Sequence, residues 1–271
     1  MNLSVKNIEP RIGAEVEADI DILLSGKAKD QLRDLLEERG VILFRDMEIT
    51  DEQHLAFSKT LGTIEGDKSG EVYKVSVSKK VNPEFAEYNL GNFSWHMDRT
   101  DLDMPNFCTI LRPQKLSPAG GETQFANTYA AYEDLPAEEK AFLDDLKVVH
   151  RVESSFREKV PHPTEEQLAR WRTYPPKVHP LVWHHKSGRN SLALSTSATE
   201  VVGMDPAEGT ALLERLMAWA TQPRYVYTHE WRMGDLLMWD NTGTMHRVLP
   251  YDPDSGRCLH RTTLAGEEAL V

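Results

Sequence analysis

The chain has 271 residues, of which 40% are hydrophobic and 27% are charged, and its formal net charge is −12. This acidic balance argues against binding to nucleic acid or to an anionic membrane surface. The two cysteines, Cys108 and Cys258, fit a reducing cytoplasm better than a disulfide framework. We find no signal peptide, no apolar stretch of membrane-spanning length, no repeat and no long linker. The expectation is therefore a single cytoplasmic domain over residues 1–271.

Capping residues and apolar spacing predict four helices. The predicted helices span 26–39, 51–61, about 137–146 and 206–219. The first has Ser25 as its expected N-cap and Gly40 just beyond its end. Thr50 and Gln53 form a capping box for the second, and Asp205 caps the last.

Short apolar runs bounded by Gly, Pro and Asp predict many strands. The predicted strands span 41–44, 72–78, 107–112, 123–126, 147–150, 181–185, 191–194, 224–231, 235–239 and 257–264. Strands and helices do not alternate, so a doubly wound parallel sheet is not expected. The pattern is typical of a mainly β protein with flanking α-helices, as a sandwich or jelly roll.

The stretch "WHMD" at 95–98 places a histidine and an aspartate two positions apart. In a strand, His96 and Asp98 would point to the same face and could bind one metal ion. The pair alone is not specific, because this spacing arises by chance among ten histidines. His246, expected on a later strand, would complete a set of two histidines and one carboxylate. That set suits non-haem Fe(II), with positions open for a co-substrate and O2.

Three further residues favour a metal site over a chance pair. Arg257 and Arg261 are four positions apart, so a strand would place both on one face. A guanidinium binds a carboxylate through two hydrogen bonds, and the hydroxyl of Thr123 can share such a group. The combination predicts a co-substrate that carries a carboxylate.

With these residues in place, the sequence resembles the Fe(II)/2-oxoglutarate-dependent dioxygenases of the taurine dioxygenase and 2,4-dichlorophenoxyacetate dioxygenase (TauD/TfdA) family. The matching motifs are "WHMD" (95–98), "GGETQFANTYAAYEDLP" (120–136), "GDLLMWDNTGTMHR" (234–247) and "HRTTL" (260–264). The resemblance implies a double-stranded β-helix, a fold of the jelly-roll type. It also implies an enzyme that consumes O2 and 2-oxoglutarate, hydroxylates a small organic acid, and releases succinate and CO2.

The resemblance also implies a role for each matched residue. The Fe(II) ligands would be His96, Asp98 and His246. The distal carboxylate of 2-oxoglutarate would be held by Arg261 and Thr123, and its C1 carboxylate would be contacted by Arg257.

The substrate implied by the resemblance is an aryloxyalkanoate, a sulfonate or a sulfate ester, whose hydroxylation can lead to C–O or C–S cleavage. Candidate substrate contacts are Asn92, Lys74, Phe93, Met97 and Tyr88. Each also has a purely structural explanation: Asn92 as a turn residue, Lys74 as a solvated strand lysine, and the others as core. Family members are often dimers or tetramers, so a homo-oligomer is expected.

Two other functions are compatible with the same residues. A Zn²⁺ hydrolase can use two histidines and a carboxylate with an open position, although it gives Arg261 no purpose. A jelly-roll binding module with a vestigial site is the other alternative, and the intact ligand set argues against it.

Overall fold

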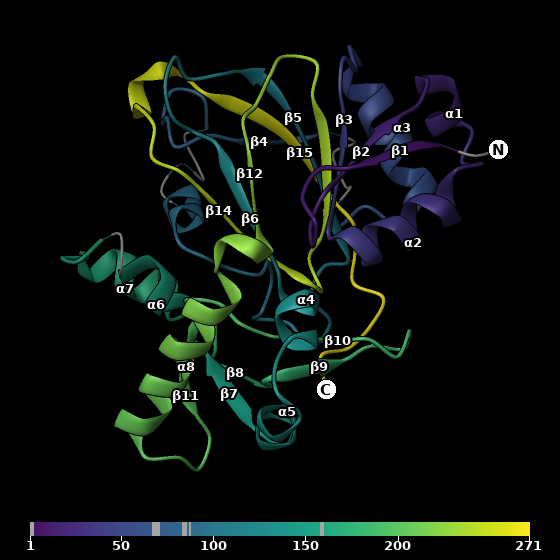
Figure 1. The fold of residues 1–271 in the computed structure, drawn as a ribbon. Helices are drawn as coiled ribbons and strands as arrows, with labels where there is room; N and C mark the ends of the chain where they lie inside the picture. Colours follow the sequence, from purple (N-terminus) through teal and green to yellow (C-terminus); the bar gives the residue numbers. More distant parts are fainter. Residues whose placement is uncertain (1–2, 67–70, 83–85, 87, 158–159) are drawn as a thin grey trace.

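Two facing β-sheets form the centre of the molecule (Figure 1). The computed structural model describes residues 3–66, 71–82, 86, 88–157 and 160–271, and the side chain of Tyr88 lies outside the description. N-terminal helices cover one side of the larger sheet, and a layer of helices and short strands lies at the lower end. The chain therefore buries apolar residues on both faces of the larger sheet.

The larger sheet has seven strands within the described residues, and neighbours run antiparallel except for one parallel pair, the second and third. In spatial order they are β1 (Ser4–Asn7), β2 (Ala14–Glu17), β3 (Val41–Phe44), β13 (Leu236–Asp240), β5 (Cys108–Lys115), β15 (Cys258–Thr263) and β4 (Tyr73–Val75). Every residue of β3 is buried, with Ile42 and Phe44 toward the helices and Val41 and Leu43 toward the inner sheet. Burial on both faces explains why β3 is a continuous apolar run rather than an alternating one.

A smaller sheet faces the inner side of the larger one. Its strands, in spatial order, are β12 (Val226–His229), β6 (Thr123–Asn127) and β14 (Thr244–Val248). Phe125 and Tyr227 from this sheet pack against Leu237 and Trp239 of the larger sheet. The predicted mainly β jelly roll with flanking helices is confirmed.

Three helices cover the outer face of the larger sheet. They are α1 (Ile20–Leu24), α2 (Lys29–Arg39) and α3 (Asp51–Leu61). Leu32, Leu36 and Phe57 are buried between these helices and the sheet. The predicted start of the first helix is wrong: Ala28 is the N-cap of α2, and Ser25 instead ends the separate helix α1. The five residues of α1 are too few for apolar periodicity to identify it.

The capping box of α3 is confirmed in both directions. The backbone N–H of Gln53 donates to Oγ1 of Thr50 at 3.2 Å, and the backbone N–H of Thr50 donates to Oε1 of Gln53 at 2.9 Å. Asp205 caps α8 (Pro206–Ala220) as predicted, because its Oδ1 accepts from two backbone N–H groups of the first turn.

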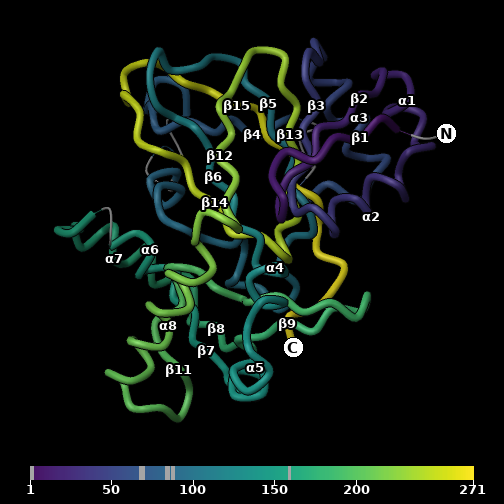
Figure 2. The backbone as a smooth tube through the Cα atoms, in the orientation of Figure 1, coloured from purple at the N-terminus to yellow at the C-terminus, as the bar shows by residue number. Residues whose placement is uncertain are grey.

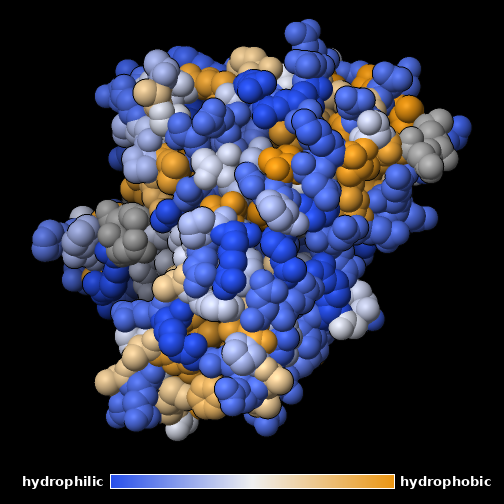
Figure 3. Space-filling view, in the orientation of Figure 1, coloured by the Kyte–Doolittle hydropathy of each residue, from blue (hydrophilic) through white to orange (hydrophobic). Residues whose placement is uncertain are grey.

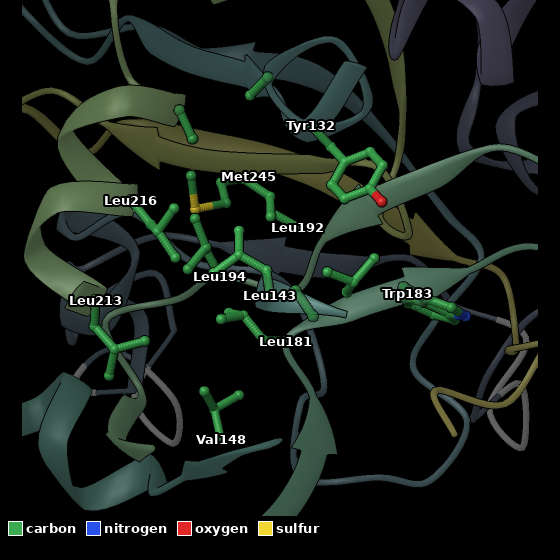
Figure 4. Close-up of a cluster of buried hydrophobic side chains, with 14 of the residues drawn as sticks. Tyr132, Leu143, Val148, Leu181, Trp183, Leu192, Leu194, Leu213, Leu216 and Met245 are labelled. Atoms are coloured by element: carbon green, nitrogen blue, oxygen red, sulfur yellow. The ribbon is translucent and has the colours of Figure 1, made fainter. Parts of the chain in front are cut away.

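One face of α8 packs against the buried cluster of the lower layer (Figure 4). Leu213 and Leu216 of α8 lie in the same buried cluster as Val148, Trp183 and Met245. The remaining elements are η1 (Tyr88–Phe93), α4 (Thr128–Glu133), α5 (Ala137–Leu143), β7 (Lys147–His150), α6 (Val152–Arg157), α7 (Glu165–Trp171), β8 (Lys177–Pro180), β9 (Val182–His184), β10 (Asn190–Leu192), β11 (Ala198–Val201), η2 (Pro223–Tyr225) and η3 (Pro253–Ser255). The sequence patterns did not predict α4, α6, α7, β1, β2, β8 or β11.

The path of the chain brings distant segments together in the larger sheet (Figure 2). Strands from the second and last thirds of the sequence, β5, β13 and β15, are hydrogen-bonded side by side. Hydrophilic residues cover much of the face shown in Figure 3, and hydrophobic residues gather in separate patches on it. Among the described residues, no helix is long and apolar enough to cross a membrane.

Candidate active site

His96 and His246 lie side by side at the open edge of the smaller sheet. They form an isolated antiparallel pair in which N of His96 donates to O of His246 at 3.0 Å and N of His246 donates to O of His96 at 2.9 Å. The expected strand through His96 and Asp98 is not formed, because a turn begins at Asp98. The backbone pairing nevertheless brings together two histidines that are 150 residues apart in sequence.

The three predicted metal ligands converge in the structure. Oδ1 of Asp98 lies 3.7 Å from Nε2 of His96 and 3.8 Å from Nε2 of His246. One candidate ligand atom from each residue lies within 4.8 Å of the other two. The side chains therefore surround one point, as expected for a shared ion.

The hydrogen bonds of the histidines test whether a cation fits this point. Nδ1 of His96 lies 2.8 Å from O of Ser94, a carbonyl that only accepts, so this nitrogen carries the proton. Nε2 is therefore the nitrogen of His96 that faces the Asp98 carboxylate and is placed to bind a metal. Burial lowers the pKa of His246 to about 3, so this ring is neutral near pH 7. The lone pair of a neutral imidazole repels a carboxylate, and a divalent cation between the two removes the repulsion.

The Asp98 carboxylate is ionised in this environment. Burial raises its pKa, but the Arg261 guanidinium beside it and the hydrogen bond from Thr109 favour the charged form, and the net effect holds the pKa below its ordinary value. A second contact comes from Oγ1 of Thr109, which lies 3.4 Å from Oδ2 of Asp98. The donor set is two imidazoles and one carboxylate, which suits a divalent transition metal.

A narrow cavity of about 40 Å³ extends from His246 into the jelly roll. The residues that line it include the three predicted to bind the co-substrate, Thr123, Arg257 and Arg261. The hydroxyl of Thr123 accepts from Nε1 of Trp231 at 2.9 Å, which leaves its own proton for a ligand in the cavity. The predicted co-substrate residues therefore do share one cavity with a metal-ligand histidine.

Arg257 lies at the end of this cavity near the start of β6. It is 4% exposed, and its Nη2 donates to O of Gly121 at 2.7 Å. Its guanidinium carbon lies 4.7 Å from the ring centre of Tyr251. Burial lowers the pKa of Arg257, and Tyr251 partly offsets that effect, so the group stays charged near pH 7. A buried cation held in this way is suited to binding a carboxylate.

Arg261 lies closer to the metal ligands. Its charge contributes to lowering the pKa of Asp98, and its guanidinium carbon lies 4.7 Å from the ring centre of Tyr73. Its Nε is buried and has no hydrogen-bond partner among the described residues. An unpaired buried N–H indicates that a ligand completes this site.

Within the part of the chain that the structure describes, two further cavities adjoin the metal ligands. A cavity of about 80 Å³ touches His96, Asp98 and Arg261, and an outer cavity of about 500 Å³ touches Asp98 and Arg261. Arg261 lines all three cavities and therefore lies at their junction. The outer cavity has aromatic walls that the sequence did not predict, formed by Tyr73, Phe156, Trp171 and Tyr174.

The structure places some of the five predicted substrate contacts in the lining of the cavities and others outside it. Asn92 lines both small cavities, and Met97, which is 3% exposed, lines the one beside His96. Phe93 packs against Tyr251 at 5.9 Å between ring centres and is not among the described lining residues.

The structure places Lys74 away from the cavities and leaves the prediction for Tyr88 untested. Lys74 is exposed and pairs with His260, so it points away from the face on which Tyr73 and Val75 line the cavities. Neighbouring strand residues face opposite sides, so Lys74 lies on the face of β4 opposite to Tyr73 and Val75. The side chain of Tyr88 lies outside the described residues.

Comparison with known proteins identifies the family of the chain. Residues 4–263 match the family described as "Taurine catabolism dioxygenase TauD, TfdA family". The chain is 32% identical to the alpha-ketoglutarate-dependent 2,4-dichlorophenoxyacetate dioxygenase of Cupriavidus pinatubonensis, over all of both chains. It is 30% identical to an alkylsulfatase of Acinetobacter baylyi, covering 98% of this chain and 86% of that one.

The fold also matches solved structures. The crystal structure of AAD-2 in complex with Mn(II) and N-oxalylglycine is 33% identical, with a TM-score of 0.86 over all of both chains. The sequence and the fold both match along nearly the whole chain. The chain belongs to the TauD/TfdA family of dioxygenases.

Proposed function

We propose that this protein is an Fe(II)- and 2-oxoglutarate-dependent dioxygenase that hydroxylates a small organic acid. The observation that carries the proposal is the cavity that joins His246 of the convergent metal-ligand set to Thr123, Arg257 and Arg261. A metal site alone fits many reactions. A metal site that opens onto two arginines fits one in which a dicarboxylate binds the metal.

The relatives support the same co-substrate. The AAD-2 complex contains Mn(II) and N-oxalylglycine, which has the skeleton of 2-oxoglutarate with an NH in place of one CH2. Bound Fe(II) would supply the activation of O2, coupled to the decarboxylation of 2-oxoglutarate to succinate and CO2. The protein would contribute the binding, orientation and shielding of the reactants.

The geometry favours a division between the two arginines that differs from the sequence-based expectation. The distal carboxylate of 2-oxoglutarate is the end remote from the metal. Arg257 lies at that end, hydrogen-bonded to Gly121 two residues before Thr123, whereas Arg261 lies beside Asp98. We therefore assign the distal carboxylate to Arg257 with Thr123. Arg261 is then placed to contact the metal-side carboxylate or the substrate.

The residues of the chain would act by position and charge. His96, Asp98 and His246 hold the metal on one side, so that the other side stays open toward the cavities. Arg257 and Thr123 determine how far the co-substrate enters the narrow cavity beside His246. The apolar wall of this cavity excludes water, and it includes Leu111, Trp239 and Val248. These contacts set the orientation of the reactants before any bond changes.

The outer cavity is the proposed binding site of the substrate. Its volume of about 500 Å³ fits a small organic molecule, and it reaches both Asp98 and Arg261. An acidic group of the substrate would bind near Arg261, while its apolar body would lie between Tyr73 and the aromatic residues of α6 and α7. Of the sequence-based candidates, Asn92 and Met97 stay in the proposal, as residues beside the metal.

The proposal is tested with anaerobic protein, Fe(II) and 2-oxoglutarate. A metal-to-ligand charge-transfer band is expected in the visible spectrum, and its absence in metal-loaded protein would refute the proposal. A panel of aryloxyalkanoates, alkyl sulfonates and sulfate esters, scored by succinate release, then identifies the substrate class. His246→Ala is the matched control that removes one ligand.

A Zn²⁺ hydrolase makes the opposite prediction. It requires hydrolytic activity with Zn²⁺ and no consumption of 2-oxoglutarate. That alternative leaves the buried Arg257 without a ligand, which is the reason for preferring a dioxygenase.

Several broader expectations belong to the same proposal. Residues 1–271 form one dioxygenase domain, as the family match over 4–263 supports. The protein acts in the cytoplasm, which its two buried free cysteines support, and forms a dimer or tetramer. Its net charge of −12 supports the absence of nucleic-acid and membrane partners. Size-exclusion chromatography with light scattering tests the oligomeric state.

A further inference from the structure

Behind the Asp98 carboxylate, three buried polar side chains form a chain of hydrogen bonds. Nε1 of Trp239 donates to Oδ1 of Asn241 at 2.6 Å, and Nδ2 of Asn241 donates to Oγ1 of Thr109 at 2.8 Å. Oγ1 of Thr109 donates to Oδ2 of Asp98 at 3.4 Å, which is the longest of the three contacts. Thr109 and Asn241 are 0% exposed and Trp239 is 2% exposed, so water does not compete for these groups.

The larger sheet brings these residues together. Trp239 on β13 lies directly opposite Thr109 on β5. Asn241 follows Trp239 by two residues, and its backbone N–H donates to O of Phe107 at 2.9 Å. We name the hydrogen-bonded residues Trp239, Asn241 and Thr109 the relay. Their positions are therefore fixed by the larger sheet and not by the turn that contains Asp98.

The direction of the chain follows from the chemistry of its first member. An indole N–H only donates, so Asn241 must accept through its amide oxygen and turn its NH2 toward Thr109. The Thr109 oxygen then accepts from Asn241. Its single proton is left for an acceptor, and Oδ2 of Asp98 is the acceptor in its direction. No rotation of the asparagine amide or of the hydroxyl gives an equally satisfied arrangement.

We propose that Trp239, Asn241 and Thr109 are positioning residues that make Asp98 a one-oxygen metal ligand. With Oδ2 held by Thr109, Oδ1 is the oxygen that faces both histidines. A carboxylate free of this contact can rotate and bind a metal through both oxygens. The second oxygen would then occupy a coordination position that a chelating co-substrate or O2 requires. The inference rests on the proposed metal site and adds the reason why its open positions stay open.

Thr109→Val removes the hydroxyl and keeps the shape of the side chain. We expect it to weaken Mn(II) binding, followed by electron paramagnetic resonance, by about 10-fold, as for other outer contacts to metal ligands. It should also shift the charge-transfer band of the anaerobic Fe(II)–2-oxoglutarate complex. Thr109→Ser restores the hydroxyl and should restore both the dissociation constant and the band.

A matched control is Thr262→Val on β15. Thr262 is also buried, at 3% exposed, but its hydroxyl contacts Ser58 and His54 on the helix side of the sheet. The same chemical change there should leave the band position and the Mn(II) dissociation constant unchanged. A change in the control equal to that in Thr109→Val would overturn the inference, because the effect would then come from the sheet and not from Asp98.

Trp239→Phe tests the relay at its far end. It removes the N–H that sets the direction of the chain and retains an aromatic ring. We expect Mn(II) binding to weaken and the charge-transfer band to shift in the same direction as in Thr109→Val, but by a smaller amount. The double variant should bind Mn(II) no more weakly than Thr109→Val alone. The relay would be overturned if the effects of the two substitutions on Mn(II) binding were additive. It would also be overturned if Thr109→Val had the Mn(II) affinity and the charge-transfer band of the wild-type protein. Wild-type protein that binds no Mn(II) and shows no band would instead overturn the proposed function itself, and the relay with it.

Discussion

Gly121 and Arg257 fit against each other so closely that a β-carbon on the glycine would lie 2.7 Å from Nε of the arginine. Gly121 also has a φ of +85°, a conformation in which other residues are strained. Gly121→Ala should therefore displace the guanidinium from the co-substrate cavity. The expected result is an increase of about 10-fold in the KM for 2-oxoglutarate, since one charge-assisted hydrogen bond contributes about 1.5 kcal/mol or more. Gly188→Ala is the control, because Gly188 has a φ of +89° and no atom within 4 Å of an added β-carbon.

The two arginines should respond differently to substitution. Arg257→Gln removes the charge that holds the distal carboxylate, so it should raise the KM for 2-oxoglutarate by about 10- to 100-fold. Arg261 lies at the junction of the three cavities, so Arg261→Gln should raise the KM for the organic substrate as well as the KM for 2-oxoglutarate. Steady-state kinetics with each substrate varied in turn separates the two effects. The opposite pattern would restore the assignment expected from the sequence.

Removal of the metal should leave the fold intact. The paired backbones of His96 and His246 exchange their hydrogen bonds without any help from an ion. Treatment with a chelator should therefore leave the far-ultraviolet circular dichroism spectrum unchanged. Mn(II) at 100 times its dissociation constant should then stabilise the protein by about 2.7 kcal/mol through binding alone. Loss of secondary structure in the chelated protein would contradict this expectation.

Asp240 should make the protein less stable as the pH rises. Burial raises the pKa of Asp240 to about 6, despite hydrogen bonds from Thr242 and Tyr129. A raised folded-state pKa contributes stability below the unfolded pKa of about 4, and this stability is lost as the pH rises through about 6. Asp240→Asn retains the oxygen that accepts from Thr242 and does not ionise.

The free energy of unfolding measures this effect directly. Between pH 4 and pH 7, wild-type protein should lose about 3 kcal/mol relative to Asp240→Asn, which is the two-unit shift expressed as free energy. Urea unfolding at each pH gives the comparison. Curves that stay parallel over this range would show that Asp240 does not titrate as expected.

Local patterns in the sequence predicted much of the fold, because short-range interactions decide those elements. The Thr50 capping box and the apolar strand β3 depend on residues next to each other, and both were predicted with correct bounds. The end of α1 at Ser25 was not predicted, because serine is equally suited to starting a helix. Short strands such as β8 have no distinct apolar pattern, and pairing with β7 is what forms them.

The metal ligands were predictable from residue type and spacing, but their geometry was not. Asp98 reaches the site from a turn, and Arg99 next to it adopts a φ of +58°, which no local pattern indicates. The face of Lys74 depends on the register between β4 and β15, which is a tertiary property. The aromatic walls on α6 and α7 belong to helices that were not predicted, so Phe156 and Trp171 carried no signal of their own.

The order of strands in the larger sheet has a consequence for synthesis on the ribosome. β5 lies between β13 and β15, so neither of its partners exists until more than a hundred further residues have been translated. The nascent chain must carry β3 and β5 with apolar faces and unpaired edges through that interval. Such edges are sites of intermolecular pairing, so newly made protein should depend on chaperones far more than the finished molecule does.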